Sequence, residues 1–243
     1  MSAAPFLLYM TTIALALQAV KERIAACAKA ARRAPQEIQL VAVSKTFPAR
    51  KIDEAYRAGQ TAFGENRAQE SLGKILALKN LPLEWHFIGP IQSNKTRAVA
   101  EHFSWVHSIE RSKTAERLSQ ARPASLPPLQ VCIQVNISGE ASKSGVAPDE
   151  LLPLARCVQT LPRLHLRGLM AIPQPTTDFE LQRNRFRRLR ELKDALGARG
   201  ILLDTLSMGM SQDLEAAILE GATIVRVGSA IFGERQPAAN QPQ

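Results

Sequence analysis

The chain has 243 residues, of which 45% are hydrophobic, so it is long enough for one large α/β domain with a sizeable core. Its 31 Lys and Arg residues against 22 Asp and Glu give a net charge of +9, which suits an anionic ligand. Aromatic residues make up only 5% and are not interleaved with the basic ones, so the stacking surfaces of single-strand nucleic-acid binders are missing. Nucleic acid is therefore not an expected partner.

The N-terminal segment, residues 1–11, is apolar enough to resemble a secretory signal. It lacks a positively charged start, Thr11 and Thr12 interrupt it, and it is too short to cross a bilayer. We expect a disordered leader here, with Met10 as an alternative start, and no membrane partner. Residues 236–243 are rich in Pro, Ala and Gln and predict a disordered tail.

Strand-like and helix-like segments alternate after a predicted helix at about 12–33. The predicted strands are 40–43, 62–63, 85–88, 105–108, 131–137, 166–171, 205–207 and 223–227. The predicted helices between them are 51–58, 66–78, 95–102, 111–121, 148–159, 179–198 and 211–219. This alternation predicts a (β/α)8 TIM barrel, a single domain over residues 12–235 with an extra N-terminal helix. An open doubly wound sheet is the alternative, but no GxGxxG motif follows the first strand.

The three cysteines Cys27, Cys132 and Cys157 are widely spaced and form no CxxC or Cys/His cluster. Cys27 lies in an Ala-rich helix and Cys132 in an apolar strand, positions typical of buried reduced thiols. We therefore expect a reducing, cytoplasmic location.

Lys45 follows the apolar run 40–44, where an ammonium group is costly to bury without a chemical reason. Alternation places Val41, Val43 and Lys45 on one face, and Pro48 stops the strand soon afterwards. Lys45 would then lie at a strand end, where barrels carry their chemistry. We interpret it as a desolvated, nucleophilic Schiff-base lysine; a lysine that only leaves the strand for water is the alternative.

Segments rich in Gly, Ser and Asn follow the strands, among them Gly64-Glu65-Asn66, Ser207-Met208-Gly209-Met210-Ser211 and Gly228-Ser229. Barrels often bind phosphate with the loops after strands seven and eight. A helix that opens at Ser211 and Gln212 would add a positive helix end. These loops predict an anion site, although each segment alone also fits an ordinary turn.

Arg226 lies inside the apolar strand 223–227. A buried guanidinium is costly without a partner, so it either pairs with a carboxylate at the rim or donates to a ligand. Arginine keeps its proton, so a pyridine nitrogen that faces it would stay unprotonated and accept a hydrogen bond. An imine-forming lysine, an anion site and this arginine suggest pyridoxal 5′-phosphate (PLP) as cofactor. A Schiff-base aldolase acting on a sugar phosphate would use similar parts.

Five segments of the chain resemble the pyridoxal phosphate homeostasis protein family in order and spacing. They are 43–46, 63–66, 86–95, 206–213 and 225–233, and the resemblance runs from about residue 12 to 235. It implies the N-terminal barrel of alanine racemase, with PLP held as an aldimine on Lys45 and its ring nitrogen facing Arg226. The phosphate positions correspond to Ser211, Gly228 and Ser229, and the expected cofactor site also includes Asn66, His86 and Ser207.

The resemblance implies a protein that buffers PLP, or delivers it to apo-enzymes, and that turns over no substrate. Racemisation needs proton donors on both faces of the substrate, and racemases take one from a tyrosine of a second domain. The tyrosines here are Tyr9, in the leader, and Tyr56, in a helix expected to face away from the mouth. His107 or His86 could in principle substitute, so a low-activity racemase or other PLP enzyme is the alternative. An arginine partner also weakens the ring as an electron sink.

Two groups of basic residues have no assigned role. The run on the long helix before strand seven, which predicts a solvated and partly ion-paired face rather than a nucleic-acid surface, is Arg183, Arg185, Arg187, Arg188 and Arg190. Lys95, Arg97 and Lys143 lie in or near strand-end loops, where they either guide an anion, offer a second amine or are plain surface charge.

Overall fold

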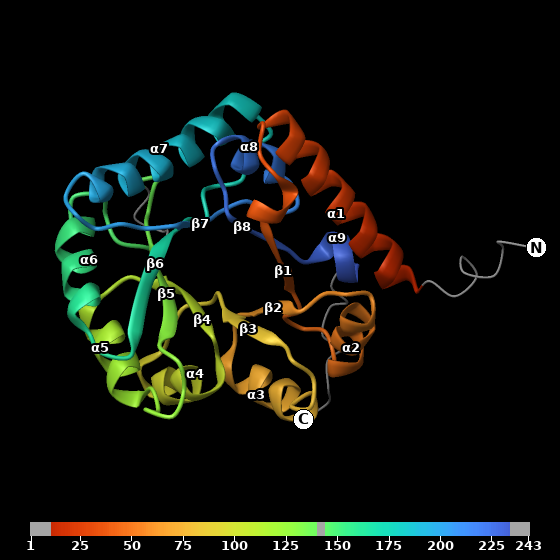
Figure 1. Ribbon diagram of the computed structural model, residues 1–243, viewed down its shortest axis with the longest axis horizontal. Coiled ribbons are helices and arrows are strands. Elements are labelled where there is room, and N and C mark those ends of the chain that lie inside the picture. The colour runs from red at the N-terminus through yellow and green to blue at the C-terminus, as the bar shows by residue number, and fades with distance from the viewer. Residues whose placement is uncertain (1–10, 140–143, 234–243) are drawn as a thin grey trace, which may run out of the picture.

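Eight parallel strands close into a barrel in the order of the chain in the computed structural model, which describes residues 11–139 and 144–233. The strands are β1 (Gln39–Val43), β2 (Ala62–Glu65), β3 (Glu84–Phe87), β4 (Trp105–Ile109), β5 (Leu129–Gln134), β6 (Leu164–Met170), β7 (Thr205–Ser207) and β8 (Ile224–Val227). Helices surround this barrel (Figure 1). The predicted TIM barrel is confirmed.

The helices follow the strands in the alternation that the sequence predicts. They are α1 (Thr12–Ala30), α2 (Ala49–Arg57), α3 (Ala68–Ala77), α4 (Thr96–His102), α5 (Ser112–Ala121), α6 (Leu151–Thr160), α7 (Phe179–Gly197), α8 (Leu214–Leu219) and α9 (Ser229–Phe232). Short 3₁₀ turns occur at η2 (Pro35–Glu37) and η3 (Ser93–Lys95). In the described part of the chain, no helix combines the length and the apolar character that crossing a membrane would require.

The extra N-terminal helix α1 starts at a side-chain cap, because the Thr11 hydroxyl accepts a hydrogen bond from the Ala14 N–H. Its buried residues recur at helical spacing: Ile13, Leu17, Val20, Ile24 and Ala28. This apolar stripe packs α1 against α8 and α9, where it closes the outer wall next to β8 and β1 (Figure 1). The rest of the predicted leader, residues 1–10, and the predicted tail lie outside the described residues.

Two cores pack on opposite faces of the sheet. The larger one fills the layer between the strands and the helices. The smaller one lies inside the barrel and consists of Val41, Ala62, Trp105, Cys132, Met170 and Ile224. Val41 belongs to this inner cluster. Val43, the last residue of β1, and Lys45, two residues beyond it, line a cavity at the mouth of the barrel. The predicted shared face of these three residues is therefore confirmed.

The cysteines differ in burial. Cys132 is fully buried, and burial raises the pKa of its thiol to about 12, which keeps it protonated and unreactive. Cys27 and Cys157 are only partly buried. The expectation of a buried thiol is correct for Cys132 and wrong for Cys27, whose helix leaves one side of that position open.

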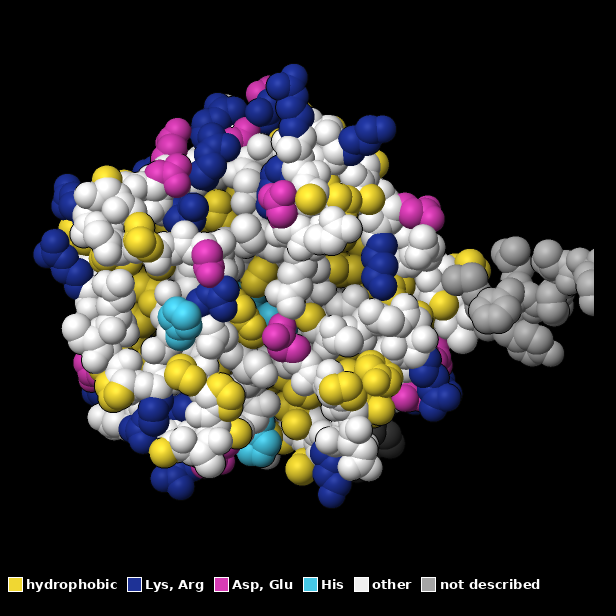
Figure 2. All heavy atoms as spheres, viewed as in Figure 1, with side chains coloured by type: hydrophobic (Ala, Val, Ile, Leu, Met, Phe, Trp, Pro, Cys, Tyr) yellow, Lys and Arg dark blue, Asp and Glu magenta, His cyan; other side chains and the backbone are white. Residues whose placement is uncertain are grey.

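Three arginines of α7 pair with one carboxylate from a neighbouring element. Glu220, at the end of α8, is 1% exposed and forms ion pairs of 2.8, 3.1 and 2.9 Å with Arg183, Arg187 and Arg190. Figure 2 shows Lys and Arg side chains at the edge of the molecule over α7, with acidic side chains among them. The sequence predicted ion pairing along the helix, but the main partner comes from the next helix.

Candidate functional site

A cavity of about 440 Å³ opens at the carboxyl ends of the strands. Six of the predicted site residues line it: Lys45, Asn66, Ser211, Arg226, Gly228 and Ser229. They come from segments that follow or end β1, β2, β7 and β8, which the closed barrel brings together. Among the described residues, no cluster of His, Cys, Asp or Glu could hold a metal ion.

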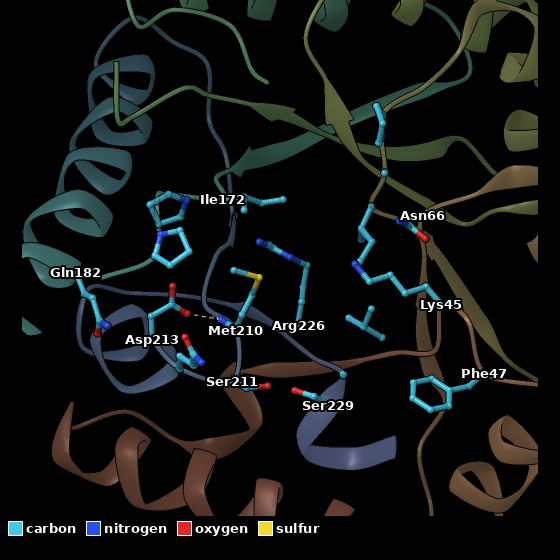
Figure 3. A pocket seen from close by; sticks show the side chains of 18 of the residues that line it. Lys45, Phe47, Asn66, Ile172, Gln182, Met210, Ser211, Asp213, Arg226 and Ser229 are labelled. Atoms are coloured by element: carbon cyan, nitrogen blue, oxygen red, sulfur yellow. Dashed lines mark hydrogen bonds between the residues drawn. The ribbon is translucent and has the colours of Figure 1, made fainter. Parts of the chain in front are cut away.

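The side chains converge on one space from opposite walls. In Figure 3, Lys45 extends into the cavity beside Asn66, and Arg226 lies across from it. The Ser211 and Ser229 side chains lie close together on a third side, below Arg226 in this view. This arrangement places an amine, a guanidinium and two hydroxyls around the same volume.

A buried ion pair supports the backbone just before Lys45. Lys74 of α3 is 8% exposed, and its Nζ lies 2.9 Å from the Glu65 carboxylate and donates to the Ser44 carbonyl at 3.1 Å. The Ser44 hydroxyl donates to the same carboxylate at 2.6 Å. Burial raises the pKa of Glu65, while the Lys74 charge opposes this rise. These contacts fix the end of β1 from which the Lys45 side chain extends.

A second contact fixes the backbone just after Lys45. Thr46 adopts φ 71°, in the left-handed region that a β-branched residue rarely occupies. Its N–H donates to Glu70 at 2.8 Å, and Glu70 pairs with Lys74 at 2.9 Å. Although burial opposes it, these hydrogen bonds lower the pKa of Glu70. The turn that aims Lys45 into the cavity is therefore held by α3 on both sides.

Arg226 is 3% exposed and forms no salt bridge with a carboxylate among the described residues. Its Nη1 donates to the Ser207 hydroxyl at 2.6 Å and its Nη2 to the Ala171 carbonyl at 3.0 Å. Burial lowers the pKa of Arg226 to about 10, with Asp213 opposing, so the guanidinium stays charged at neutral pH. Of the two predicted roles, the rim ion pair is not formed, and the side chain lines the cavity.

Two glycines allow the Ser211 and Ser229 side of the cavity to form. Gly209 has φ +93°, and a Cβ there would lie 2.6 Å from the Ala217 side chain. Gly228 precedes α9, and its Cβ would lie 3.1 Å from the Val43 carbonyl of β1. Without these side chains, the loops after β7 and β8 approach closely enough for Ser211 and Ser229 to share one wall.

The helix after β7 begins later than predicted. α8 starts at Leu214, because residues 211–213 form a turn in which the Asp213 carboxylate accepts from the Met210 N–H at 2.6 Å. Burial raises the pKa of Asp213. Ser211 therefore lies on this turn and not on the helix itself. Asp213 belongs to the motif 206–213 but has no role predicted from the sequence, although its position after a strand could have indicated one.

Much of the cavity wall is apolar, a character that was not predicted, although Met210 lies in one of the predicted strand-end segments. This wall includes Phe47, Ile88, Ile172, Pro173 and Met210. The Phe47 ring stacks on Phe232 of α9 with centroids 5.2 Å apart, which ties the turn after β1 to the last helix. Each of these residues lies in the segment after a strand, so its position in the predicted barrel could have placed it at the cavity.

Two predicted site residues lie deeper than expected. His86 and Ser207 are each 0% exposed and are not among the residues that line the cavity. His86 points into the barrel from the middle of β3, below the strand end, and bonds to His107 and Glu84. Direct contact with a ligand is thus not supported for His86, and Ser207 reaches the cavity through Arg226.

The basic residues near the loops do not add to the cavity. The Lys95 ammonium group donates to Gln69 at 2.6 Å and does not line the cavity. Lys143 lies outside the described residues, so its predicted position is not placed.

Comparisons with known proteins identify the family of the chain. Residues 15–236 match the family model for the alanine racemase N-terminal domain. The chain is 60% identical over 230 residues to the pyridoxal phosphate homeostasis protein of Pseudomonas aeruginosa, which covers 95% of this chain and 99% of that one. It is 53% identical over 229 residues to the protein of the same name from Escherichia coli K12, over 93% and 98% of the two chains.

A solved structure shares both the fold and the sequence pattern. PipY of Synechococcus elongatus PCC7942, solved with PLP bound, superposes with a TM-score of 0.81 at 37% identity, over 91% of this chain and all of that one. A sequence identity of 37% over 91% of the chain is higher than two unrelated barrels of the same fold would share. The chain therefore belongs to the pyridoxal phosphate homeostasis protein family, built on the alanine racemase N-terminal domain.

Proposed function

We propose that this protein binds PLP covalently on Lys45 and buffers or delivers it, without turning over a substrate of its own. The observation that carries the proposal is the convergence of Lys45, Arg226 and the hydroxyls of Ser211 and Ser229 on one cavity. The names of its relatives and the PLP-bound structure of PipY support the same ligand.

The residues present fit the chemical groups of PLP. The cavity of about 440 Å³ is within the range typical of small-molecule sites. A phosphate dianion suits hydroxyl donors and the backbone N–H groups at the start of α9, in a chain with a net charge of +9. Arg226 can only donate, so it suits an unprotonated pyridine nitrogen. The apolar wall formed by residues such as Ile172 and Met210 suits the ring faces.

The covalent bond needs only the lysine and the ligand aldehyde. The Lys45 Nζ attacks the carbonyl carbon, a C=N bond forms and one water molecule leaves, so no oxidant or further reactant is needed. The remaining residues hold the ligand: Ser211 and Ser229 at the phosphate, Arg226 at the ring nitrogen. Because the reaction reverses with water, the same site can release PLP to an apo-enzyme.

The cavity is poorly equipped for racemisation. Among the described lining residues there is no tyrosine, histidine or cysteine, and Asp213 is their one carboxylate. That carboxylate accepts from the Met210 N–H, so it belongs to the turn. His107, considered as a substitute proton donor, is fully buried and does not line the cavity. These observations favour a carrier over a weak racemase.

Absorbance and hydride trapping test the proposal directly. The purified protein saturated with PLP should absorb in the visible range as a lysine imine does. After borohydride reduction, the added mass should map to the peptide that carries Lys45. A colourless protein that acquires no adduct after saturation and reduction would reject PLP as the ligand.

The carrier role has its own test. The PLP-loaded protein incubated with L- and D-amino acids in deuterated water should exchange no α-proton beyond the rate of free PLP. Transfer of PLP to an apo-enzyme, measured by recovery of that enzyme's activity, should occur in the same preparation. Sustained α-proton exchange would instead establish the racemase alternative.

A further inference from the structure

A chain of hydrogen bonds runs through the barrel interior from the cavity to the opposite rim. Arg226 Nη1 bonds to Ser207 Oγ at 2.6 Å, and Ser207 Oγ to His107 Nδ1 at 2.7 Å. His107 Nε2 then bonds to His86 Nδ1 at 2.9 Å, and His86 Nε2 to Glu84 at 2.6 Å. Four strands contribute, because β8, β7, β4 and β3 each place one or more of these side chains inside the barrel.

Both ends of this chain fix its direction. Arg226 has no acceptor atom, so it must donate to Ser207. From the carboxylate end, each neutral imidazole offers one donor and one acceptor, so the Ser207 hydroxyl hydrogen is directed at His107 Nδ1. His107 consequently carries its proton on Nε2 and donates to His86, which carries its proton on Nε2 as well. The final acceptor is Glu84, whose ionised carboxylate can only accept. Every donor therefore points away from the cavity.

The protonation states agree with this direction. His86 and His107 are fully buried, and desolvation lowers the pKa of both, so each is neutral at pH 7. The hydrogen bond from His86 lowers the pKa of Glu84 and keeps it ionised, although that side chain is 39% exposed. Trp105 stacks on His86 with centroids 5.5 Å apart and an interplanar angle of 7°, which fixes the imidazole plane.

The hydrogen-bond chain affects the position of Arg226 because that guanidinium has few other hydrogen-bond partners. Its two resolved hydrogen bonds go to Ser207 and to the Ala171 carbonyl, and no carboxylate pairs with it among the described residues. A hydroxyl whose own proton is already engaged is the better acceptor, since linked hydrogen bonds strengthen one another. Without His107, Ser207 could rotate and release the arginine.

We propose that His107, His86 and Glu84 are positioning residues that hold Arg226 in line with the ligand ring nitrogen through a one-way hydrogen-bond chain. This inference rests on the proposed function for the identity of the ligand. According to this proposal, residues inside the barrel that do not line the cavity contribute to the selectivity for a ligand with a pyridine nitrogen.

The tautomers of His86 and His107 test the direction of the hydrogen-bond chain in the absence of any ligand. In the full-length protein freed of PLP, long-range ¹H–¹⁵N NMR spectra should show His86 and His107 as neutral rings protonated on Nε2. His165 is exposed, and His165→Gln serves to assign its signal without disturbing the interior. A proton on Nδ1 of either buried ring, or a charged imidazolium at pH 7, would overturn the proposal.

A PLP analogue with carbon in place of the ring nitrogen tests the effect on the ligand. We expect His107→Phe to reduce the preference for PLP over this analogue by about tenfold, the worth of one hydrogen bond to a charged group. His165→Gln should leave the preference unchanged. If a folded His107→Phe protein binds PLP and the analogue more weakly by the same factor, the proposal is overturned, because a general packing defect affects both ligands alike.

Substitutions at the far rim provide a variant that does not disturb packing. Glu84 also accepts from Gln39 at 2.8 Å, so Glu84→Gln keeps an oxygen at that position, whereas Glu84→Leu removes it. We expect the preference for PLP over the carbon analogue to fall about threefold in Glu84→Leu and to be retained in Glu84→Gln. An unchanged preference in Glu84→Leu contradicts the chain. A wild-type protein that binds neither compound contradicts the proposed function instead.

Discussion

Lys45→Ala is expected to abolish the borohydride-stable PLP adduct completely, while leaving a weaker, reversible binding of PLP. The variant removes the amine that forms the C=N bond, but Ser211, Ser229 and Arg226 still line the cavity. Mass spectrometry after reduction should detect no modified peptide from this cavity. Equilibrium dialysis should detect residual binding that inorganic phosphate displaces, because the proposed phosphate contacts of Ser211 and Ser229 remain.

Lys95→Ala is the matched control. This lysine lies in the loop after β3, donates to Gln69 and does not line the cavity, so its loss should leave the adduct at the wild-type level. An adduct that persists in Lys45→Ala and disappears in Lys95→Ala would move the reactive amine to that loop. Equal trapping in both variants would indicate only non-specific modification of surface lysines.

The barrel could be predicted from the sequence because each strand is a short apolar run followed by an amphipathic helix. The errors lie at boundaries where side-chain contacts decide the outcome. β5 ends at Gln134 and not at residue 137, since Val135 continues only as an isolated bridge to Val146. β2 extends through Gly64 and Glu65, although neither is typical of a strand, because both pair with β3.

Lys45 and Arg226 could be predicted because a charge inside an apolar strand, or directly after one, is costly to bury and requires a reason. The partners that hold them could not. Lys74 reaches Ser44 and Glu65 from a neighbouring helix, and His107 reaches Ser207 across 100 positions of sequence. Such contacts depend on which side chains a closed barrel brings face to face, and no local spacing encodes them.

The His86 position illustrates the same limit. Its place in a motif beside Phe87 and Ile88 indicated proximity to the ligand, and the strand does lead to the cavity through Ile88. The side-chain alternation of β3 instead turns His86 inward, between Trp105 and His107. Side-chain alternation therefore decides whether a residue of the motif lines the cavity, as Ile88 does, or lies inside the barrel.

Lys74→Met is the second substitution with a large expected effect, here on stability. It removes the partner of Glu65, which is 0% exposed, and leaves an uncompensated buried carboxylate. Breaking a buried pair in this way costs about 3–5 kcal/mol of unfolding free energy. Urea denaturation of the ligand-free protein should measure that loss. Lys51→Met, which removes a partly exposed pair with Glu54, should cost at most about 1 kcal/mol.

The loss should depend on pH with a definite sign. Burial raises the pKa of Glu65, and removing the Lys74 charge raises it further. A carboxyl whose folded pKa is raised destabilises the protein only as the pH rises above its unfolded value of about 4.3. The difference between Lys74→Met and wild type should therefore be larger at pH 8 than at pH 5.

Adding Glu65→Gln to Lys74→Met should restore most of the lost stability, because a neutral amide can still accept from Ser44 without a buried charge. If the double variant is no more stable than Lys74→Met, the loss comes from packing and not from the unpaired carboxylate. The restored protein would still lack the ammonium group that holds the Ser44 carbonyl. We therefore expect it to form the Lys45 adduct more slowly than wild type, which separates support of the fold from alignment of the reactive lysine.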